Sequence, residues 1–213
     1  MSNMVDDVYK GSQERNFLGH PIGLSICFLT EMWERFSYYG MRAILILYLT
    51  KYHLFGVNKA SMIYGAYAGL VYMMPIVGGY LADRYLGSRK AVTYGAILLV
   101  LGHGLMAFHG PAAYMDGENI IRDDFFINVF FLALALIIGG VGFLKANISR
   151  VVGALYGPND PRRDGGFSIF YMGINLGALL AMIVVGYVGE VHGWNYGFSI
   201  AGIGMLFGLL VFL

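Results

Sequence analysis

Six long apolar stretches, separated by short polar connections, limit most strongly what this chain can fold into. Each is long enough to cross the hydrocarbon core of a bilayer as a helix, which needs about 20 apolar residues. They fall at residues 22–50, 60–83, 91–110, 125–155, 167–189 and 195–213. The sequence therefore predicts an all-α membrane protein with six transmembrane helices, of which the first and fourth are long enough to tilt.

The composition supports a membrane location. Of the 213 residues, 58% are hydrophobic and only 13% are charged, whereas about a quarter of the residues in a soluble domain are charged. Because so few charged residues could not cover the surface of a soluble fold, much of the surface must meet lipid. The net charge of +1 gives no reason to expect a nucleic-acid partner, and Cys27 is the single cysteine, which excludes an intrachain disulfide or a cysteine-based metal site.

The distribution of lysine and arginine among the connections predicts a cytoplasmic N-terminus. In that orientation the cytoplasmic side holds Lys10, Arg15, Arg84, Arg89, Lys90, Arg150, Arg162 and Arg163. The opposite side holds only Lys51, Lys59 and Arg122. We expect residues 1–21 to form a cytoplasmic segment without a removable signal peptide, and residues 22–213 to form the transmembrane bundle.

The first predicted span carries ionisable side chains at a depth where they are costly. At 3.6 residues per turn, one stripe of this helix holds Glu31, Glu34, Arg35, Tyr38 and Arg42. Each charge facing lipid would cost about 3 kcal/mol on insertion scales, so the stripe must face a cavity or another helix. One interpretation is an ion-pair lattice that only fixes helix packing. We favour a proton relay or substrate site, which intramembrane carboxylates usually mark.

The fourth predicted span contains a single lysine, Lys145, near its cytoplasmic end. Its ammonium could extend to the membrane surface, or it could face the interior like the charges of the first span. If spans 1–3 and 4–6 form two inverted three-helix repeats, the first and fourth spans are equivalent. Glycine pairs with the small-xxx-small spacing that permits close helix packing occur at Gly65 and Gly69 and at Gly173 and Gly177.

Three stretches resemble motifs of one family, the proton-dependent oligopeptide transporters (POT/PTR) of the major facilitator superfamily. Residues 31–40 resemble the family's E-x-x-E-R-F-x-Y-Y-G motif on the first helix, and residues 170–177 resemble its F-Y-x-x-I-N-x-G signature on the fifth. Residues 79–90 resemble the superfamily loop G-x-L-A-D-R-x-x-G-x-R-K. Because Asp83 in this loop lies unfavourably near a helix C-terminus, we expect an arginine or a helix N-terminus beside it.

The resemblance covers essentially the whole chain and implies the N-terminal one of two six-helix bundles. It implies that Glu31 and Glu34 couple protons, with Arg35 as their partner, and that Arg35 and Lys145 face the peptide carboxylate. The other positions that it places in the peptide pocket are Tyr38, Tyr39, Arg42, Tyr72, Tyr171 and Asn175. The conformational loop would include Gly79, Asp83, Arg84, Gly87 and Arg89. Protons would be the coupling ion, with no cofactor and no metal.

The sequence thus predicts a symporter, not an enzyme, that imports di- and tripeptides with protons by alternating access. Its partners would be peptides, protons, lipid and the C-terminal six-helix bundle. The same fold carrying nitrate or another small solute remains an alternative, and a membrane receptor or intramembrane enzyme is a remote one, since the histidines form no HExxH or Ser/His/Asp arrangement. Gly65 and Ala146 depart from the family pattern and point to a bacterial member, hence to the bacterial inner membrane.

Overall fold

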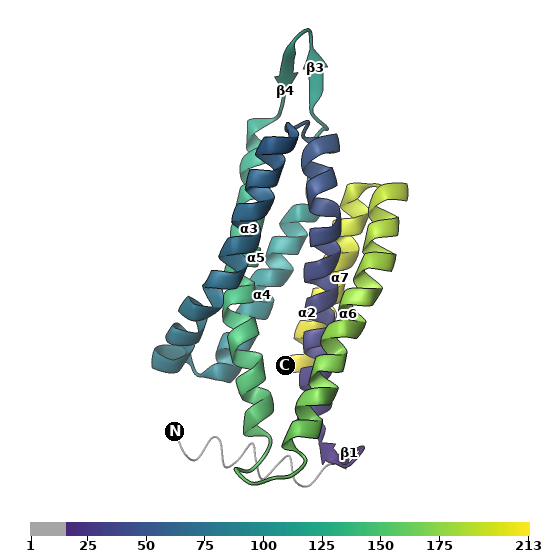
Figure 1. Cartoon of the computed structure of the whole chain (residues 1–213). Helices are drawn as coiled ribbons and strands as arrows, with labels where there is room; N and C mark the ends of the chain where they lie inside the picture. The colour runs from purple at the N-terminus through teal and green to yellow at the C-terminus, as the bar shows by residue number, and fades with distance from the viewer. Residues whose placement is uncertain (1–15) are drawn as a thin grey trace.

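The computed structural model describes residues 16–213, and Lys10 and Arg15, which entered the orientation argument, lie outside this range. Six α-helices run along a common direction (Figure 1). They are α2 (Ile22–Leu47), α3 (Val57–Leu81), α4 (Ser88–Ala107), α5 (Asp124–Ala154), α6 (Arg163–Val191) and α7 (Trp194–Phe212). Short π-helical segments, η1 (Tyr48–Tyr52) and η2 (Ala82–Leu86), continue α2 and α3.

All six predicted spans are helices, and their ends lie within a few residues of the predicted ends. The structure also contains two hairpins that the sequence did not predict. β1 (Asn16–Phe17) pairs with β2 (His20–Pro21) before α2, and β3 (Tyr114–Asp116) pairs with β4 (Asn119–Ile121) between α4 and α5. Gly117 in the second hairpin has a φ of 62°, a conformation that glycine adopts without steric cost. Strands of two or three residues leave too little alternation in the sequence to be recognised.

Helices of the first half of the chain pack mainly against helices of the second half. The first helix of the first half, α2, packs mainly against α6 and α7, whereas the first helix of the second half, α5, packs mainly against α3 and α4. The third helices, α4 and α7, pack against each other. Since α5 lies three crossings after α2, it runs in the opposite direction, and the two inverted three-helix repeats predicted from the sequence are confirmed.

Close helix approaches occur where glycine removes the side chain, but only at one of the two predicted pairs. A Cβ atom at Gly177 would overlap the carbonyl oxygen of Met32, and one at Gly173 would also press on α2. At Gly65 and Gly69, no atom of the other described helices lies within 4 Å of such a Cβ. The prediction of a close approach is therefore confirmed for the α6 pair and wrong for the α3 pair within this bundle.

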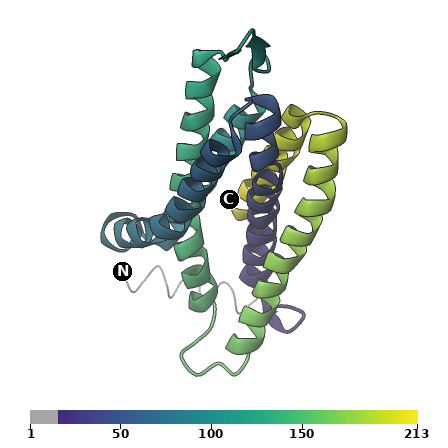
Figure 2. The same cartoon turned by 45° about the horizontal axis from the view of Figure 1, so that its top comes forward.

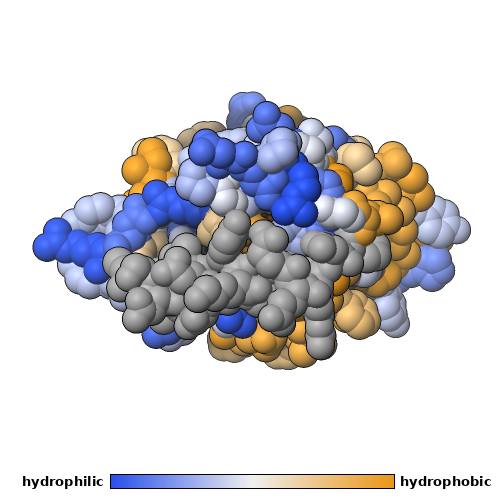
Figure 3. Space-filling view, turned by 90° about the horizontal axis from the view of Figure 1, so that it is seen from below, coloured by the Kyte–Doolittle hydropathy of each residue, from blue (hydrophilic) through white to orange (hydrophobic). Residues whose placement is uncertain are grey.

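The sides of the bundle are apolar, as a multi-pass membrane protein requires. Large apolar side chains are exposed along α3 and α6, among them Met62, Ile76, Leu179 and Ile183. These two helices lie on opposite sides of the bundle in both ribbon views (Figures 1 and 2). Seen from below, polar residues gather over the end of the molecule and apolar residues lie at its sides (Figure 3).

Among the described helices, five are long and apolar enough by composition to cross a membrane, namely α3 with its η2 extension, α4, α5, α6 and α7. The remaining helix, α2, has 26 residues and would reach about 39 Å at 1.5 Å per residue, which is ample for a bilayer. It carries Glu31, Glu34 and Arg35 near its middle, and these charges set it apart from the other five.

Candidate functional site

The charged stripe of α2 is buried inside the bundle. Glu31, Glu34 and Arg35 are 3%, 0% and 4% exposed. The Nε atom of Arg35 lies 3.0 Å from Oε1 of Glu31 and also contacts Oε2 of Glu34. Because Gly177 has no side chain, α6 approaches the backbone of Met32 and the Cβ of Arg35, which closes this side of α2. The requirement that the stripe face away from lipid is confirmed.

This cluster holds two carboxylates and only one guanidinium. Among the described residues, Oε2 of Glu31, Oε1 of Glu34 and Nη2 of Arg35 have no hydrogen-bond partner. With all three groups ionised the cluster carries one uncompensated negative charge, and such a charge is costly in a buried site. A proton on either carboxylate, or a further cation, would neutralise it. The arrangement can therefore bind a proton and can exchange the partner of Arg35.

Aromatic side chains continue the cluster towards α3. The Cζ atom of Arg35 lies 5.5 Å from the ring centroid of Tyr38. The Tyr38 ring meets Tyr39 edge to face, with centroids 5.1 Å apart, and stacks on Tyr67 of α3 at 6.4 Å. The hydroxyl groups of Tyr38 and Tyr67 are buried and have no partner among the described residues. Such hydroxyls can donate a hydrogen bond to a polar ligand that reaches them, or accept one from it.

Arg42, one turn further along α2, also reaches α3. Its Nε donates a hydrogen bond of 2.5 Å to the hydroxyl of Tyr64. Neither Tyr64 nor Tyr67 was among the residues predicted for the site. Their spacing of three residues places them on neighbouring positions of one helix face, but the sequence does not show that this face meets α2.

Lys145 is half-buried on α5 and lies against α3. Its Nζ atom is 4.7 Å from the ring centroid of Tyr72, a distance that permits a cation–π interaction. The Tyr72 side chain is 60% exposed, so this pair borders a surface that the described helices leave open. The structure thus brings Lys145 and Tyr72, both predicted for the site, together. The ammonium lies beside an aromatic ring, whereas the other interpretation of the sequence extended it to the membrane surface.

The two predicted residues of α6 stand apart from the α2 cluster. Tyr171 is 53% exposed, and its ring contacts are with Phe167 and Phe170 of its own helix. Asn175 is also exposed, two residues before Gly177, which abuts α2. Within residues 16–213, neither side chain is hydrogen-bonded to the cluster. Both lie on the flank of the bundle that is open for a partner or a ligand.

The predicted conformational loop contains an ion pair between η2 and α5. Nη1 of Arg150 bonds to Oδ1 of Asp83, with both side chains about half exposed, so the expected arginine beside Asp83 is confirmed. Gly87, at the junction with α4, has a φ of 77°, which favours glycine. The other predicted loop residues lie in the same turn or beside it: Gly79, Arg84 and Arg89.

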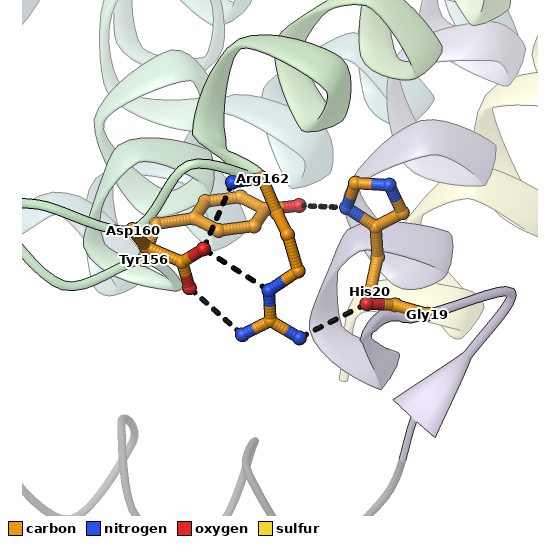
Figure 4. Close-up of polar contacts among 5 residues, drawn as sticks. All are labelled: Gly19, His20, Tyr156, Asp160 and Arg162. Atoms are coloured by element: carbon orange, nitrogen blue, oxygen red, sulfur yellow. Dashed lines mark hydrogen bonds and ion pairs between the residues drawn. The ribbon is translucent and has the colours of Figure 1, made fainter.

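A second polar cluster at this end ties the segment before α2 to the α5–α6 connection (Figure 4). Nδ1 of His20 lies 2.9 Å from the Tyr156 hydroxyl, and Nη1 of Arg162 donates to the Gly19 carbonyl oxygen at 3.0 Å. Arg162 also pairs with Asp160 at 2.7 Å, and its hydrogen bonds lower the pKa of Asp160 to about 2. This cluster could not be predicted from the sequence, because its members come from the segment before α2 and from the distant α5–α6 connection.

Two inverted three-helix repeats of apolar helices, with a buried ion cluster on the first helix, define half of a major facilitator superfamily transporter. A solved structure supports this class directly. The chain superimposes on a variant of the peptide transporter POT in complex with alafosfalin, with a TM-score of 0.86 and 44% sequence identity. The match covers 98% of this chain and 41% of that one.

Sequence comparison gives the family. The chain is 46% identical over 206 residues to the peptide transporter YePEPT of Yersinia enterocolitica, covering 93% of this chain and 37% of that protein. It is 45% identical over 208 residues to a di-/tripeptide transporter of Lactococcus lactis subsp. cremoris, covering 93% and 38%. The sequence model of PTR2, the POT family, matches residues 89–213. The chain belongs to the POT family.

This assignment confirms the resemblance drawn from the three motifs, and it excludes the enzyme alternative, since these relatives are transporters. The first-helix motif lies outside the stretch that the family model matches. Motif and model are therefore separate indications of the same family. The chain spans about 40% of the length of the curated relatives that it matches.

Proposed function

We propose that this chain forms the N-terminal six-helix bundle of a proton-coupled symporter that imports di- and tripeptides by alternating access. The protein would lie in a bacterial plasma membrane with its N-terminus in the cytoplasm, and a C-terminal six-helix bundle would complete it. The observation that carries the proposal is the buried cluster of Glu31, Glu34 and Arg35, in which two carboxylates share one guanidinium. The names of the relatives support the substrate class.

Proton coupling follows from the competition between the two carboxylates for Arg35. When both are ionised, the guanidinium is held on its own helix. A proton on one carboxylate removes one of the two ionic partners of Arg35. The guanidinium then becomes available to a peptide carboxylate. Nη2 of Arg35, which lacks a partner among the described residues, is the donor through which that contact would form. Proton binding and peptide binding thereby favour the same state of the cluster.

Peptide recognition would use polar groups of α2, α3, α5 and α6. Arg35 and Lys145 supply two cations for the peptide carboxylate. Hydroxyl groups for the peptide amide come from Tyr38, Tyr39, Tyr67 and Tyr72. From further along α2, Arg42 would line the same pocket, and Tyr171 and Asn175 would contribute from α6. An anionic group for the peptide ammonium would come from the C-terminal bundle.

The exposed pair of Asp83 and Arg150 suits a contact that breaks and reforms in each transport cycle. Exposed ion pairs contribute about 0–1 kcal/mol to stability, so breaking this one adds little to the barrier between two conformations. It joins the η2 end of α3 to α5. We propose that it holds these helix ends together in one conformation of the transporter and releases them in the other.

The test is uptake of labelled dialanine by the complete transporter in liposomes, with and without an inward proton gradient. We expect gradient-driven accumulation that unlabelled di- and tripeptides block and that free amino acids and nitrate do not. Glu31→Gln and Glu34→Gln should each abolish accumulation while leaving counterflow exchange measurable. Block by nitrate, without block by dipeptides, would replace the peptide with a small anion as the cargo. Gradient-independent uptake in the wild type would contradict proton coupling.

A further inference from the structure

A pocket of about 370 Å³ lies where α3 and α5 begin, at the end of the bundle that carries the β3–β4 hairpin. Three charged side chains line it: Lys59 from the first turn of α3, Arg122 from the segment before α5, and Asp124 from the start of α5. Its apolar lining includes Phe55, Ile127 and Phe131. None of these residues belongs to the proposed peptide and proton site.

The Arg122 guanidinium is fixed in this pocket. Its Nε donates to the carbonyl oxygen of His53 at 2.6 Å, and its Nη2 donates to that of Leu54 at 2.9 Å. Leu54 has a φ of 51°, in the left-handed region that a leucine rarely adopts. Cζ of Arg122 also lies 4.5 Å from the ring centroid of Phe55. A strained turn thus helps to hold one cation in place, a feature that is common at binding sites.

A second cation lies on the same aromatic ring. The ammonium of Lys59 is 4.9 Å from the Phe55 centroid, and it forms no hydrogen bond or ion pair with any described residue. Asp124 lines the same pocket, yet in the described part of the chain its carboxylate pairs with neither Lys59 nor Arg122. The pocket therefore presents two cations that have no carboxylate partner among the described residues, and one separate anion. A ligand that carries the opposite charges would complement all three.

The order of these groups along the membrane normal matches that of a phospholipid. The charged residues lie at the starts of α3 and α5, where the spans enter the bilayer. Ile127 and Phe131 lie one and two turns further along α5, and Phe131 is about 10 Å deeper than Asp124 at 1.5 Å per residue. Phe131 is 41% exposed, so an acyl chain can reach it from the side.

We propose that this pocket binds an aminophospholipid of the phosphatidylethanolamine class. Lys59 and Arg122 hold the phosphate, Asp124 holds the headgroup ammonium, and Ile127 and Phe131 contact the first part of an acyl chain. The carboxylate gives the site its selectivity, because an anionic lipid without an ammonium leaves Asp124 unpaired. The inference rests on the membrane-spanning fold and is independent of what the transporter carries.

The test is native mass spectrometry of the complete transporter in detergent, titrated with phosphatidylethanolamine or phosphatidylglycerol. We expect the wild type to bind phosphatidylethanolamine more tightly. Lys59→Gln should weaken both lipids by about fivefold, the size of effect expected for one charged contact of about 1 kcal/mol. Asp124→Asn should weaken phosphatidylethanolamine alone and remove the preference between the two lipids.

Matched controls are Lys51→Gln and Asp116→Asn, which remove exposed charges at the same end of the bundle but outside the pocket. Both should bind lipid like the wild type, and thermal unfolding should show every variant to be folded. Equal binding by the Lys59 and Lys51 variants, or a lipid preference that survives Asp124→Asn, would overturn the proposal. Displacement of the lipid by soluble phosphoethanolamine would also overturn it, since that result assigns the pocket to a free headgroup.

Discussion

The chain contains two ion-pair sites whose surroundings are opposite. The cluster of Glu31, Glu34 and Arg35 is buried, comes from a single helix and contains polar atoms that have no partner among residues 16–213. The pair of Asp83 and Arg150 joins two helices and is about half exposed. Water screens the second pair and can replace either partner, whereas nothing described replaces a partner in the first. The comparison shows that the buried site is suited to detect a proton, and that the exposed one is suited to break and reform.

The largest effect is expected when the cation of the buried cluster is removed. Arg35→Ala leaves two carboxylates in a buried site without a counter-charge, which should destabilise the bundle by about 3–5 kcal/mol. Thermal unfolding of the purified transporter would measure the loss. Arg35→Lys keeps the charge and serves as the matched variant, and it should regain most of the stability. Equal stability of the alanine and lysine variants would show that the charge of Arg35 does not stabilise the fold.

A pH effect of intermediate size is expected at His53, in the connection between η1 and α3. Burial, with a smaller contribution from Arg122, lowers the pKa of His53 from 6.5 to about 4. The unfolded chain therefore binds a proton before the folded one does, so the stabilising contribution is complete above pH 6.5 and is lost as the pH falls towards 4. The upper limit is about 3 kcal/mol for a shift of this size.

Thermal unfolding of the wild type between pH 7 and pH 4.5 would measure this loss. His53→Gln, which cannot take up a proton, should flatten that part of the profile. His192→Gln removes an exposed histidine from another connection and is the matched control, expected to keep the wild-type slope. An unchanged slope in the His53 variant would assign the pH dependence to other groups.

A smaller effect, on transport, is expected at Lys145, which is less buried than the Glu31, Glu34 and Arg35 cluster. Lys145→Gln should raise the KM for dialanine by about tenfold, equivalent to about 1.4 kcal/mol for the loss of one charged contact to the peptide carboxylate. Lys51→Gln removes an exposed lysine that belongs to no proposed site, and it should leave the KM close to that of the wild type. Unchanged kinetics in the glutamine variant would place the ammonium outside the peptide site.

The smallest effect on stability is expected at the exposed pair. Asp83→Asn should change the free energy of unfolding by less than about 1 kcal/mol, while it slows transport if the pair holds one conformation. The charge exchange of Asp83→Arg with Arg150→Asp should restore part of the transport rate, and a double-mutant cycle would measure the coupling. A loss of stability as large as that of Arg35→Ala would contradict the contrast between the two sites.

The spans and the buried charges could be predicted because each follows from one strong constraint. A helix needs about 20 apolar residues to cross a bilayer, and a charge within it must avoid lipid. The position of Tyr67 could not be predicted in this way, since α3 is apolar on every side and its sequence does not show which face meets Tyr38. For the same reason the glycine spacing at Gly65 and Gly69 predicted a contact that the described helices do not make.

The packing of α2 against helices of the second half of the chain has a consequence for biosynthesis. During synthesis α2 is made before α3, α4 and α5, whereas α6 and α7, against which it mainly packs, are made after them. Its charges must therefore remain in the bilayer through the synthesis of three further helices. Glu31 and Glu34 lie four residues and one residue before Arg35 on the same helix, so the ions can neutralise one another before any other helix arrives. The order in which the helices are made thus favours a cluster built from α2 alone.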